Sequence, residues 1–267
     1  MARGIKRRRL CTCVLPVVLA MTALAAAQQA ANEPEANPAR PTVATPAALT
    51  PTGYLQFETG TLTARHSPEF GARTGVNEVM KLAVSDSVEL LLSAEPLVHY
   101  SVAGAAANST SDVFIGVQTV LHHGSGAKPT LAASYLRQVF DGGIPDVDFG
   151  SPRNSLLLLA SADLRGFHYD ANAMFNEVRQ ERVSRLQVGQ TLSVSHKLSS
   201  RFTVAGELWH FTQPFLKAHA VGNLWALSYS ARKNLVLDAG FDRGITSTST
   251  RWEVFAGFTY LLPRRLW

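Results

Sequence analysis

His168 and Asp170 are the side chains whose types and spacing come closest to catalytic chemistry in this sequence. They lie two residues apart in a stretch that alternates apolar and polar residues, so in a strand they share one face. A carboxylate there could orient the imidazole, as in hydrolase triads. No nucleophile can be assigned to the pair, and the adjacent Ser195 and His196 point to opposite faces. These residues therefore give a hydrolase only weak support.

Metal chemistry has little support in the residue pattern. His122 and His123 are neighbours at the end of an expected strand and point apart, which does not suit a shared metal. Asp141, Asp146 and Asp148 could supply oxygen ligands for calcium, although a solvated loop is the simpler interpretation. We predict no catalytic residue, no metal and no cofactor, and we do not expect an enzyme.

The N-terminal residues have the pattern of a secretory signal peptide. A basic stretch ending at Arg9 precedes an apolar run from Cys11 to Ala26, and small residues around Ala27 predict cleavage before Gln28. Residues 1–27 contain both cysteines, 5 of the 25 basic residues and none of the 20 acidic ones. The remaining chain is balanced in charge, which argues against nucleic acid as a partner.

Residues 28–52 are rich in alanine and proline and lack any apolar period. This composition predicts a disordered or polyproline-like leader. Residues 53–267 differ, because segments of about ten residues with a period of two recur there and no helical stripe or apolar run of transmembrane-helix length occurs. The expected organisation is a signal peptide (1–27), a leader (28–52) and one β domain (53–267).

Twelve such segments can be counted, although ten or fourteen strands stay possible. They are Tyr54–Gly60, Val76–Val84, Val88–Glu95, Asp112–His122, Thr130–Val139, Asn154–Ala162, Phe167–Glu177, Ser184–His196, Arg201–His210, Ala220–Ser230, Leu235–Phe241 and Arg251–Leu262.

The connections between these segments alternate in length. Those that follow odd segments, such as 61–75 and 96–111, are longer than or as long as the connections that follow even segments, such as 85–87. Long external loops alternating with short periplasmic turns are typical of outer-membrane barrels, whose closure also removes the unpaired edges that lipid does not tolerate. We therefore predict an all-β fold, a closed antiparallel transmembrane β-barrel in the bacterial outer membrane.

Alternation assigns apolar residues such as Ile115, Leu192, Leu208 and Val254 to lipid and the opposite parity to the lumen. Carboxylates outnumber cations among these inward residues, so the lumen holds either a polar network centred on Lys81 or water. The candidate lumen-lining residues are Glu58, Lys81, Glu89, Gln118, His168, Asp170, Asn172, Gln187, Glu207, Asp238 and Glu253.

Four stretches resemble bacterial outer-membrane proteins of the meta-pathway of phenol degradation transporter family. They are Tyr54–Gly60, Val88–Leu92, Asn234–Phe241 and Trp252–Pro263, within a layout that is similar from Gly53 to the end. The resemblance implies an outer-membrane barrel that passes small, often aromatic or apolar compounds. It supplies no catalytic motif.

The leading hypothesis is thus an outer-membrane channel or transporter for small solutes. The alternatives are a structural or surface-interaction barrel with a packed lumen and, less favoured, an outer-membrane lipid or ester hydrolase. Expected partners are outer-membrane lipid and a small-molecule solute, and no oligomeric state is predicted.

Overall fold

The computed structural model describes residues 34–144, 152–180 and 182–267. The chain divides into residues 1–34 and a compact unit, Glu35–Trp267, which contains all the strands. The predicted signal peptide lies outside the described residues. Within the described residues, no helix is long and apolar enough to span a membrane.

Thirteen strands make one antiparallel sheet. They are β1 (Leu55–Arg65), β2 (Ala72–Ala83), β3 (Val88–Val102), β4 (Ala105–Ser109), β5 (Val113–His122), β6 (Thr130–Phe140), β7 (Pro152–Leu164), β8 (Phe167–Gln180), β9 (Val183–Lys197), β10 (Phe202–Gln213), β11 (Ala218–Arg232), β12 (Leu235–Gly244) and β13 (Trp252–Leu261).

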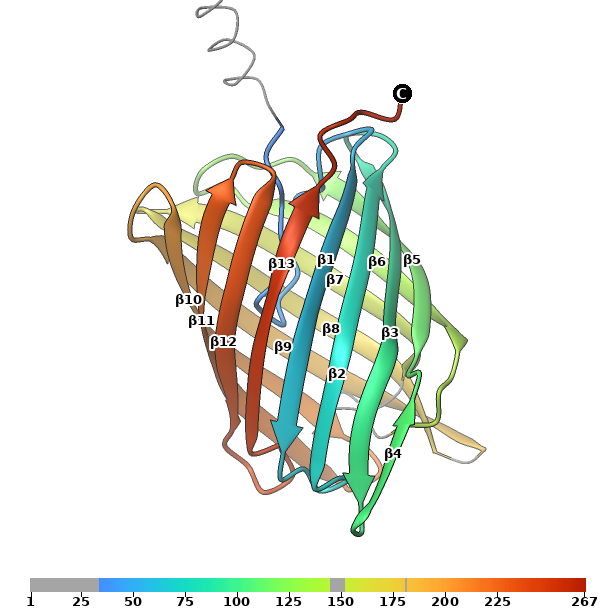
Figure 1. Ribbon diagram of the computed structural model, residues 1–267. Coiled ribbons are helices and arrows are strands. Elements are labelled where there is room, and N and C mark those ends of the chain that lie inside the picture. Colours follow the sequence, from blue (N-terminus) through green and yellow to red (C-terminus); the bar gives the residue numbers. More distant parts are fainter. Residues whose placement is uncertain (1–33, 145–151, 181) are drawn as a thin grey trace, which may run out of the picture. The chain divides into compact units, whose positions relative to one another are not determined.

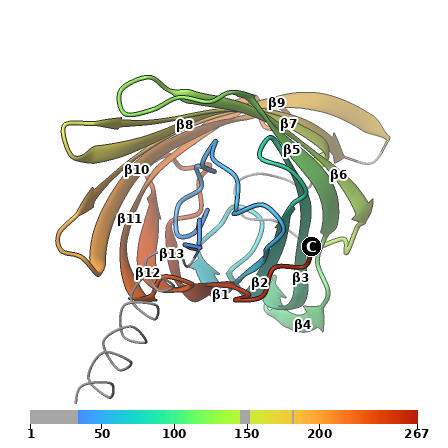
Figure 2. The same ribbon diagram turned by 90° about the horizontal axis from the view of Figure 1, so that it is seen from above.

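Twelve of these strands close into a barrel. Each pairs with its neighbours in sequence, β1 also pairs with β13, and β3 pairs with both β2 and β5 (Figures 1 and 2). The short β4 pairs only with the end of β3 and extends it as a hairpin. The predicted closed barrel of twelve strands is confirmed, with β4 as an addition.

The strands are longer than predicted at one end of the barrel. Residues 61–75 were expected as a loop, yet β1 runs to Arg65, β2 begins at Ala72, and the two are paired along their length. Similarly, the expected loop at 178–183 is mostly strand, because β8 ends at Gln180 and β9 begins at Val183. Beyond the hydrocarbon layer the outer face need not be apolar, so strands continue there without the alternation that reveals them in sequence.

The tight turns carry the backbone geometry expected of hairpins. Arg165 and Gly166 join β7 to β8 with φ angles of 53° and 83°. Positive φ at both central residues is the requirement of a type I′ turn, which matches the right-handed twist of the flanking strands. The register of the β7–β8 pair therefore places Asp163 opposite His168.

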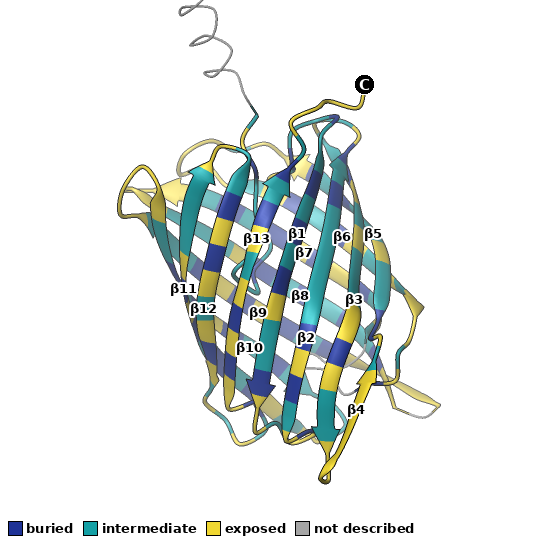
Figure 3. Ribbon diagram, viewed as in Figure 1, coloured by how far each residue is buried: buried dark blue, intermediate teal, exposed yellow. Residues whose placement is uncertain are grey.

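Burial alternates along the strands, as Figure 3 shows. Ile115, Leu192, Leu208 and Val254 are exposed on the outer face, as their parity predicts. The opposite residues are buried and mostly polar, which is the reverse of a soluble sandwich.

Large aromatic rings also point inward, but they lie close to the barrel wall. Trp209 is paired with Gly222 and Phe211 with Gly189 on neighbouring strands. A Cβ atom added to either glycine would overlap the facing ring. The glycines thus let the rings lie flat, which leaves space nearer the barrel axis.

Candidate functional site: a lumen occupied by the N-terminal segment

The lumen contains residues 35–52, which we call the lumen segment (Figure 2). It enters beside the β11–β12 turn, where the Ala36 N–H donates to the Lys233 carbonyl at 2.9 Å. It ends at the β2–β3 rim, where the Gly53 N–H donates to Ala83 at 2.8 Å. We expected a disordered leader over residues 28–52, whereas this part of it follows a defined path inside the barrel.

Two wall amides pair with the backbone of the lumen segment. The Gln56 side chain accepts from the Asn37 N–H at 2.9 Å and donates to the Asn37 carbonyl at 2.8 Å. Asn172 does the same with Thr45, at 2.7 and 2.9 Å. Each amide matches the donor and the acceptor of one residue, so these contacts recognise a peptide backbone whatever its side chains.

Two buried carboxylates each accept adjacent backbone N–H groups. Glu207 takes those of Val43 and Ala44, both at 2.7 Å. Glu58 takes those of Ala39 and Arg40, both at 3.1 Å. Hydrogen bonds to a charged acceptor are short and strong, and they offset part of the cost of burying the carboxylate.

The far side of the lumen holds the second half of the segment. The Ser161 hydroxyl accepts from the Ala47 N–H at 2.7 Å, and Gln118 donates to the Pro46 carbonyl at 3.0 Å. Glu89 accepts from the Thr50 N–H at 2.9 Å and from its hydroxyl at 2.5 Å. Strands on all sides of the barrel therefore contact the segment.

One ion pair also joins the lumen segment to the wall. The Arg40 guanidinium donates to the Asp238 carboxylate from Nη2 at 3.1 Å and from Nε at 3.3 Å. It lies over Gly60 and Gly257, which face each other on β1 and β13, and a Cβ at either position would overlap it. These glycines form a recess that only the absence of side chains makes possible.

Nine of the eleven predicted lumen residues are buried, and most of them contact the lumen segment. Lys81 pairs with Glu58 at 2.5 Å, so the lysine supports a carboxylate that binds the segment. Gln187 accepts from Asn176 at 3.0 Å, and Glu253 is buried on β13. The buried residues are Glu58, Lys81, Glu89, Gln118, Asn172, Gln187, Glu207, Asp238 and Glu253.

His168 and Asp170 are less buried and lie together near the rim, with Nε2 and Oδ2 3.2 Å apart. Asp170 also accepts from the Ser161 hydroxyl at 2.5 Å, while the other nitrogen of His168 lies 2.8 Å from Asp163. In a triad the imidazole contacts the nucleophile, but here the carboxylate stands between the serine and the histidine. The cluster is not arranged for nucleophilic catalysis.

A cavity of about 420 Å³ lies between the lumen segment and the wall. Arg40, Pro41 and Val43 of the segment line it together with seven apolar wall residues, Leu62, Leu136, Leu157, Met174, Trp209, Leu224 and Phe255. Asp242 and Glu253 add carboxylates, and Asp242 accepts from the Trp209 indole at 2.6 Å. The cavity offers space for a small compound with an apolar body.

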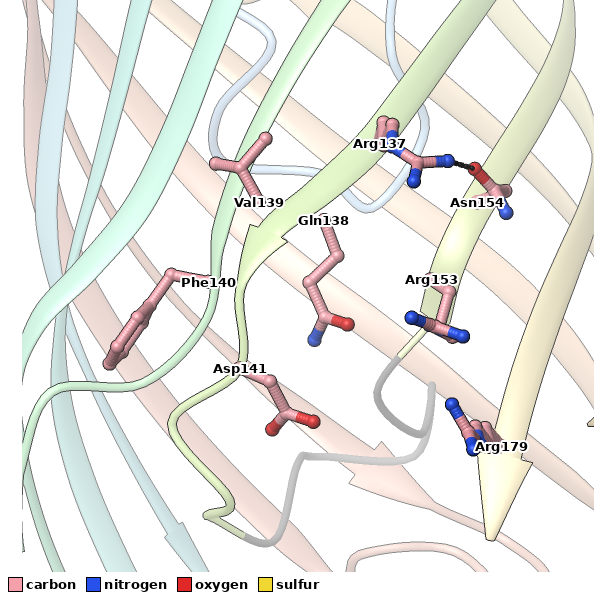
Figure 4. A pocket seen from close by; sticks show the side chains of 8 residues that line it. All are labelled: Arg137, Gln138, Val139, Phe140, Asp141, Arg153, Asn154 and Arg179. Atoms are coloured by element: carbon pink, nitrogen blue, oxygen red, sulfur yellow. Dashed lines mark hydrogen bonds between the residues drawn. The ribbon is translucent and has the colours of Figure 1, made fainter. Parts of the chain in front are cut away.

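A second cavity, of about 440 Å³, lies at the end of β6, β7 and β8 (Figure 4). Arg137, Arg153 and Arg179 line it with Asp141, and Arg137 donates to Asn154 at 3.2 Å. Asp146 and Asp148, considered above for calcium, lie outside the described residues. Among the described residues, no three His, Cys, Asp or Glu side chains are placed to hold a metal.

The residues that the sequence analysis missed belong to the lumen segment. Arg40 is the only basic residue between Gln28 and Thr52, and the predicted lumen had too few cations for its carboxylates. That imbalance was the available signal that a cation had to come from elsewhere in the chain.

A closed barrel of twelve antiparallel strands, with an apolar outer face and a polar interior, is a bacterial outer-membrane β-barrel. Solved structures of that class are similar to it. An outer membrane channel from Pseudomonas putida F1 aligns with a TM-score of 0.58 and 12% identity, over 81% of this chain and 98% of that one.

Two porins align over similar lengths. The NanC porin has a TM-score of 0.54 and 13% identity, over 77% of this chain and 98% of its own. The KdgM porin in complex with disordered oligogalacturonate has 0.51 and 11%, over 78% and 98%. No family model and no curated protein matches the sequence. The similarity therefore establishes the fold.

Proposed function

We propose that this protein is an outer-membrane channel for small solutes, and that the lumen segment closes its path in the described state. The observation that carries the proposal is what fills the lumen. A barrel packed shut by its own wall would have large inward side chains that meet at the axis, whereas here a separable chain segment occupies it. Wall side chains hold that segment mainly through hydrogen bonds to its backbone.

The likeness to outer-membrane channels supports the same function, and the resemblance to the phenol-degradation transporter family narrows the solute. Small aromatic or apolar compounds are our proposed cargo, because the cavity beside the lumen segment has an apolar lining that includes Trp209 and Phe255. The eleven predicted lumen residues are the proposed lining of the path once the segment leaves. Outer-membrane lipid and the solute are the proposed partners.

The proposed organisation is a signal peptide over residues 1–27, a leader over 28–52 whose second part is the lumen segment, and the barrel from Gly53 onward. Removal of the signal peptide leaves a mature chain that begins at Gln28. Mass spectrometry of the N-terminus of the exported protein tests this boundary.

A structural or surface-interaction barrel is the second candidate, and the occupied lumen is the observation that favours it. Planar-bilayer recording and liposome swelling separate the two functions. A channel predicts low conductance for the full chain and large, stable conductance after deletion of residues 35–50. A folded deletion variant without conductance or solute flux would support the structural barrel instead.

A further inference from the structure

The wall of the lumen is matched to the backbone of a bent peptide segment more closely than a water-filled pore requires. Gln56 and Asn172 each satisfy both backbone groups of one residue, and these residues, Asn37 and Thr45, are eight positions apart. Between them, Glu58 and Glu207 each accept two consecutive N–H groups. Water would satisfy isolated polar side chains, but it does not explain donors and acceptors placed in the order of a backbone.

We propose that these wall side chains form a binding site, here called the seat, for oligopeptides that adopt the same bent backbone course, and that residues 36–50 occupy it as an internal ligand. The inference deepens the proposed channel function. It rests on that function in one respect, because the peptide must enter the barrel through the channel. Binding itself requires a folded barrel with a vacant seat. The site thus has a ligand class, short peptides, in addition to any solute that crosses the channel.

The seat also defines which peptides fit. Ala44 and Ala47 are fully buried, so the corresponding ligand positions must carry small side chains. Proline is accepted where the backbone nitrogen needs no acceptor, and Pro46 contributes only its carbonyl. A ligand rich in alanine, threonine and proline meets these conditions, and its prolines reduce the conformational entropy lost on binding because each fixes one φ angle.

One cationic side chain completes the ligand. The Arg40 side chain is about one-sixth exposed and its partner Asp238 almost fully buried, at 17% and 2%. The recess over Gly60 and Gly257 admits a flat guanidinium, which a planar fork fills better than a lysine ammonium does. We therefore expect a strong preference for arginine at the position of Arg40, four residues before the buried alanine at the position of Ala44.

The test uses the full chain with a site for a specific protease inserted after Pro51. The folded protein is cut in detergent, so that the lumen segment is held only by the seat. A fluorescent synthetic peptide with the sequence of residues 35–50 is then added, and binding is followed by anisotropy and by mass spectrometry of the displaced segment. We expect saturable binding and exchange, with unlabelled peptide competing.

Altered peptides and barrels define the specificity. An Arg40→Ala peptide should bind about tenfold more weakly or worse, since a partly buried charged hydrogen bond is lost, and a scrambled peptide should not compete. Asp238→Asn in the barrel should weaken the native peptide but not the Arg40→Ala peptide. Asp163→Asn is the matched control. The same carboxylate-to-amide change is made there at an exposed side chain that pairs with His168 and not with the lumen segment.

Equal binding of the scrambled peptide would overturn the proposal. Retention of the original segment against a thousandfold excess of labelled peptide would also overturn it, because the segment would then be a permanent part of the core. A barrel that binds the peptide but shows no conductance with residues 35–50 deleted would retain this inference and remove the channel function. The two proposals can thus fail separately.

Discussion

The Arg40 guanidinium and the Asp238 carboxylate form an ion pair across 198 positions of sequence, with Nη2 and Oδ1 3.1 Å apart. Asp238 lies on β12, the last strand but one, so its recess is complete only when β13 has closed against β1. Full seating of the lumen segment therefore needs a closed barrel. Its binding therefore reports on a closed barrel.

Deletion of residues 35–50 should make the barrel conductive and selective for cations. The deletion leaves Glu58, Glu89, Glu207 and Asp238 without the N–H groups and the guanidinium that now bind them. A path lined by carboxylates attracts cations and repels anions. The measurement is the reversal potential across a bilayer in a potassium chloride gradient. A preference for chloride would contradict the assignment of these residues to the path.

The change Gly60→Ala should loosen the lumen segment. Its new methyl group would overlap the guanidinium of Arg40, so the ion pair with Asp238 would be displaced. We expect brief openings in single-channel recordings of the full chain. Gly206→Ala is the control, because its methyl group would lie against the ring of Trp225 on the outer face, away from the lumen segment. Identical recordings from both variants would show that the recess does not matter.

Glu207→Gln should weaken the seating of the segment at Val43 and Ala44. An amide presents one acceptor oxygen where the carboxylate presents two, so one of the two N–H groups loses its bond, at a cost of about 1–3 kcal/mol. Hydrogen exchange at these two amides should become faster, while exchange at Asn37 changes less. Glu177→Gln is the matched control, because Glu177 lies near the C-terminal end of β8 and binds Asn154 of the wall. This change should leave the exchange at Val43 and Ala44 unaltered.

The protein should not hydrolyse esters or phospholipids. Asp170 separates the Ser161 hydroxyl from the His168 imidazole, so neither nitrogen of the imidazole contacts a nucleophile among the described residues. Assays with a chromogenic ester and with phospholipid vesicles should give the background rate. A rate above background that His168→Ala abolishes would revive the hydrolase hypothesis.

Leu208→Arg should impair folding into lipid vesicles. Leu208 is 61% exposed on the outer face near the middle of β10, and arginine at the bilayer midplane costs about 2–4 kcal/mol. Val183→Arg, at the end of β9, should cost about 0–1 kcal/mol. Unfolding in urea, followed by tryptophan fluorescence, gives both free energies. Equal costs would place the hydrocarbon layer elsewhere on the barrel.

The sequence was sufficient for the barrel because lipid on one side and polar groups on the other impose a period of two. Twelve segments, their order and the inward position of residues such as Glu58 and Asn172 all follow from that period. The ends of β1 and β8 do not follow from it, because polar residues such as Thr63 and Arg179 replace the apolar ones on the outer face there. β4 was missed for the same reason, since Ala105–Ser109 carries no apolar alternation.

The lumen segment could not be predicted from any periodic pattern. Its backbone groups bind wall side chains from β1, β3, β5, β7, β8 and β10, so it needs neither a helix nor a ladder of its own. Proline and alanine therefore do not oppose this bound conformation, although a stretch rich in them normally predicts disorder. Only the excess of inward carboxylates over cations pointed toward a missing partner, and that excess did not identify Arg40.

Both ends of the lumen segment lie at the same rim, beside Lys233 and Ala83. A pull on its N-terminal end from that side would therefore load its bonds one after another, first at Ala36 and Asn37, then at Arg40, and last at Thr50. Bonds loaded in series yield at a much smaller force than bonds sheared together. A modest tension applied at the N-terminal end can therefore extract the segment, whereas spontaneous release requires all of these bonds to break together.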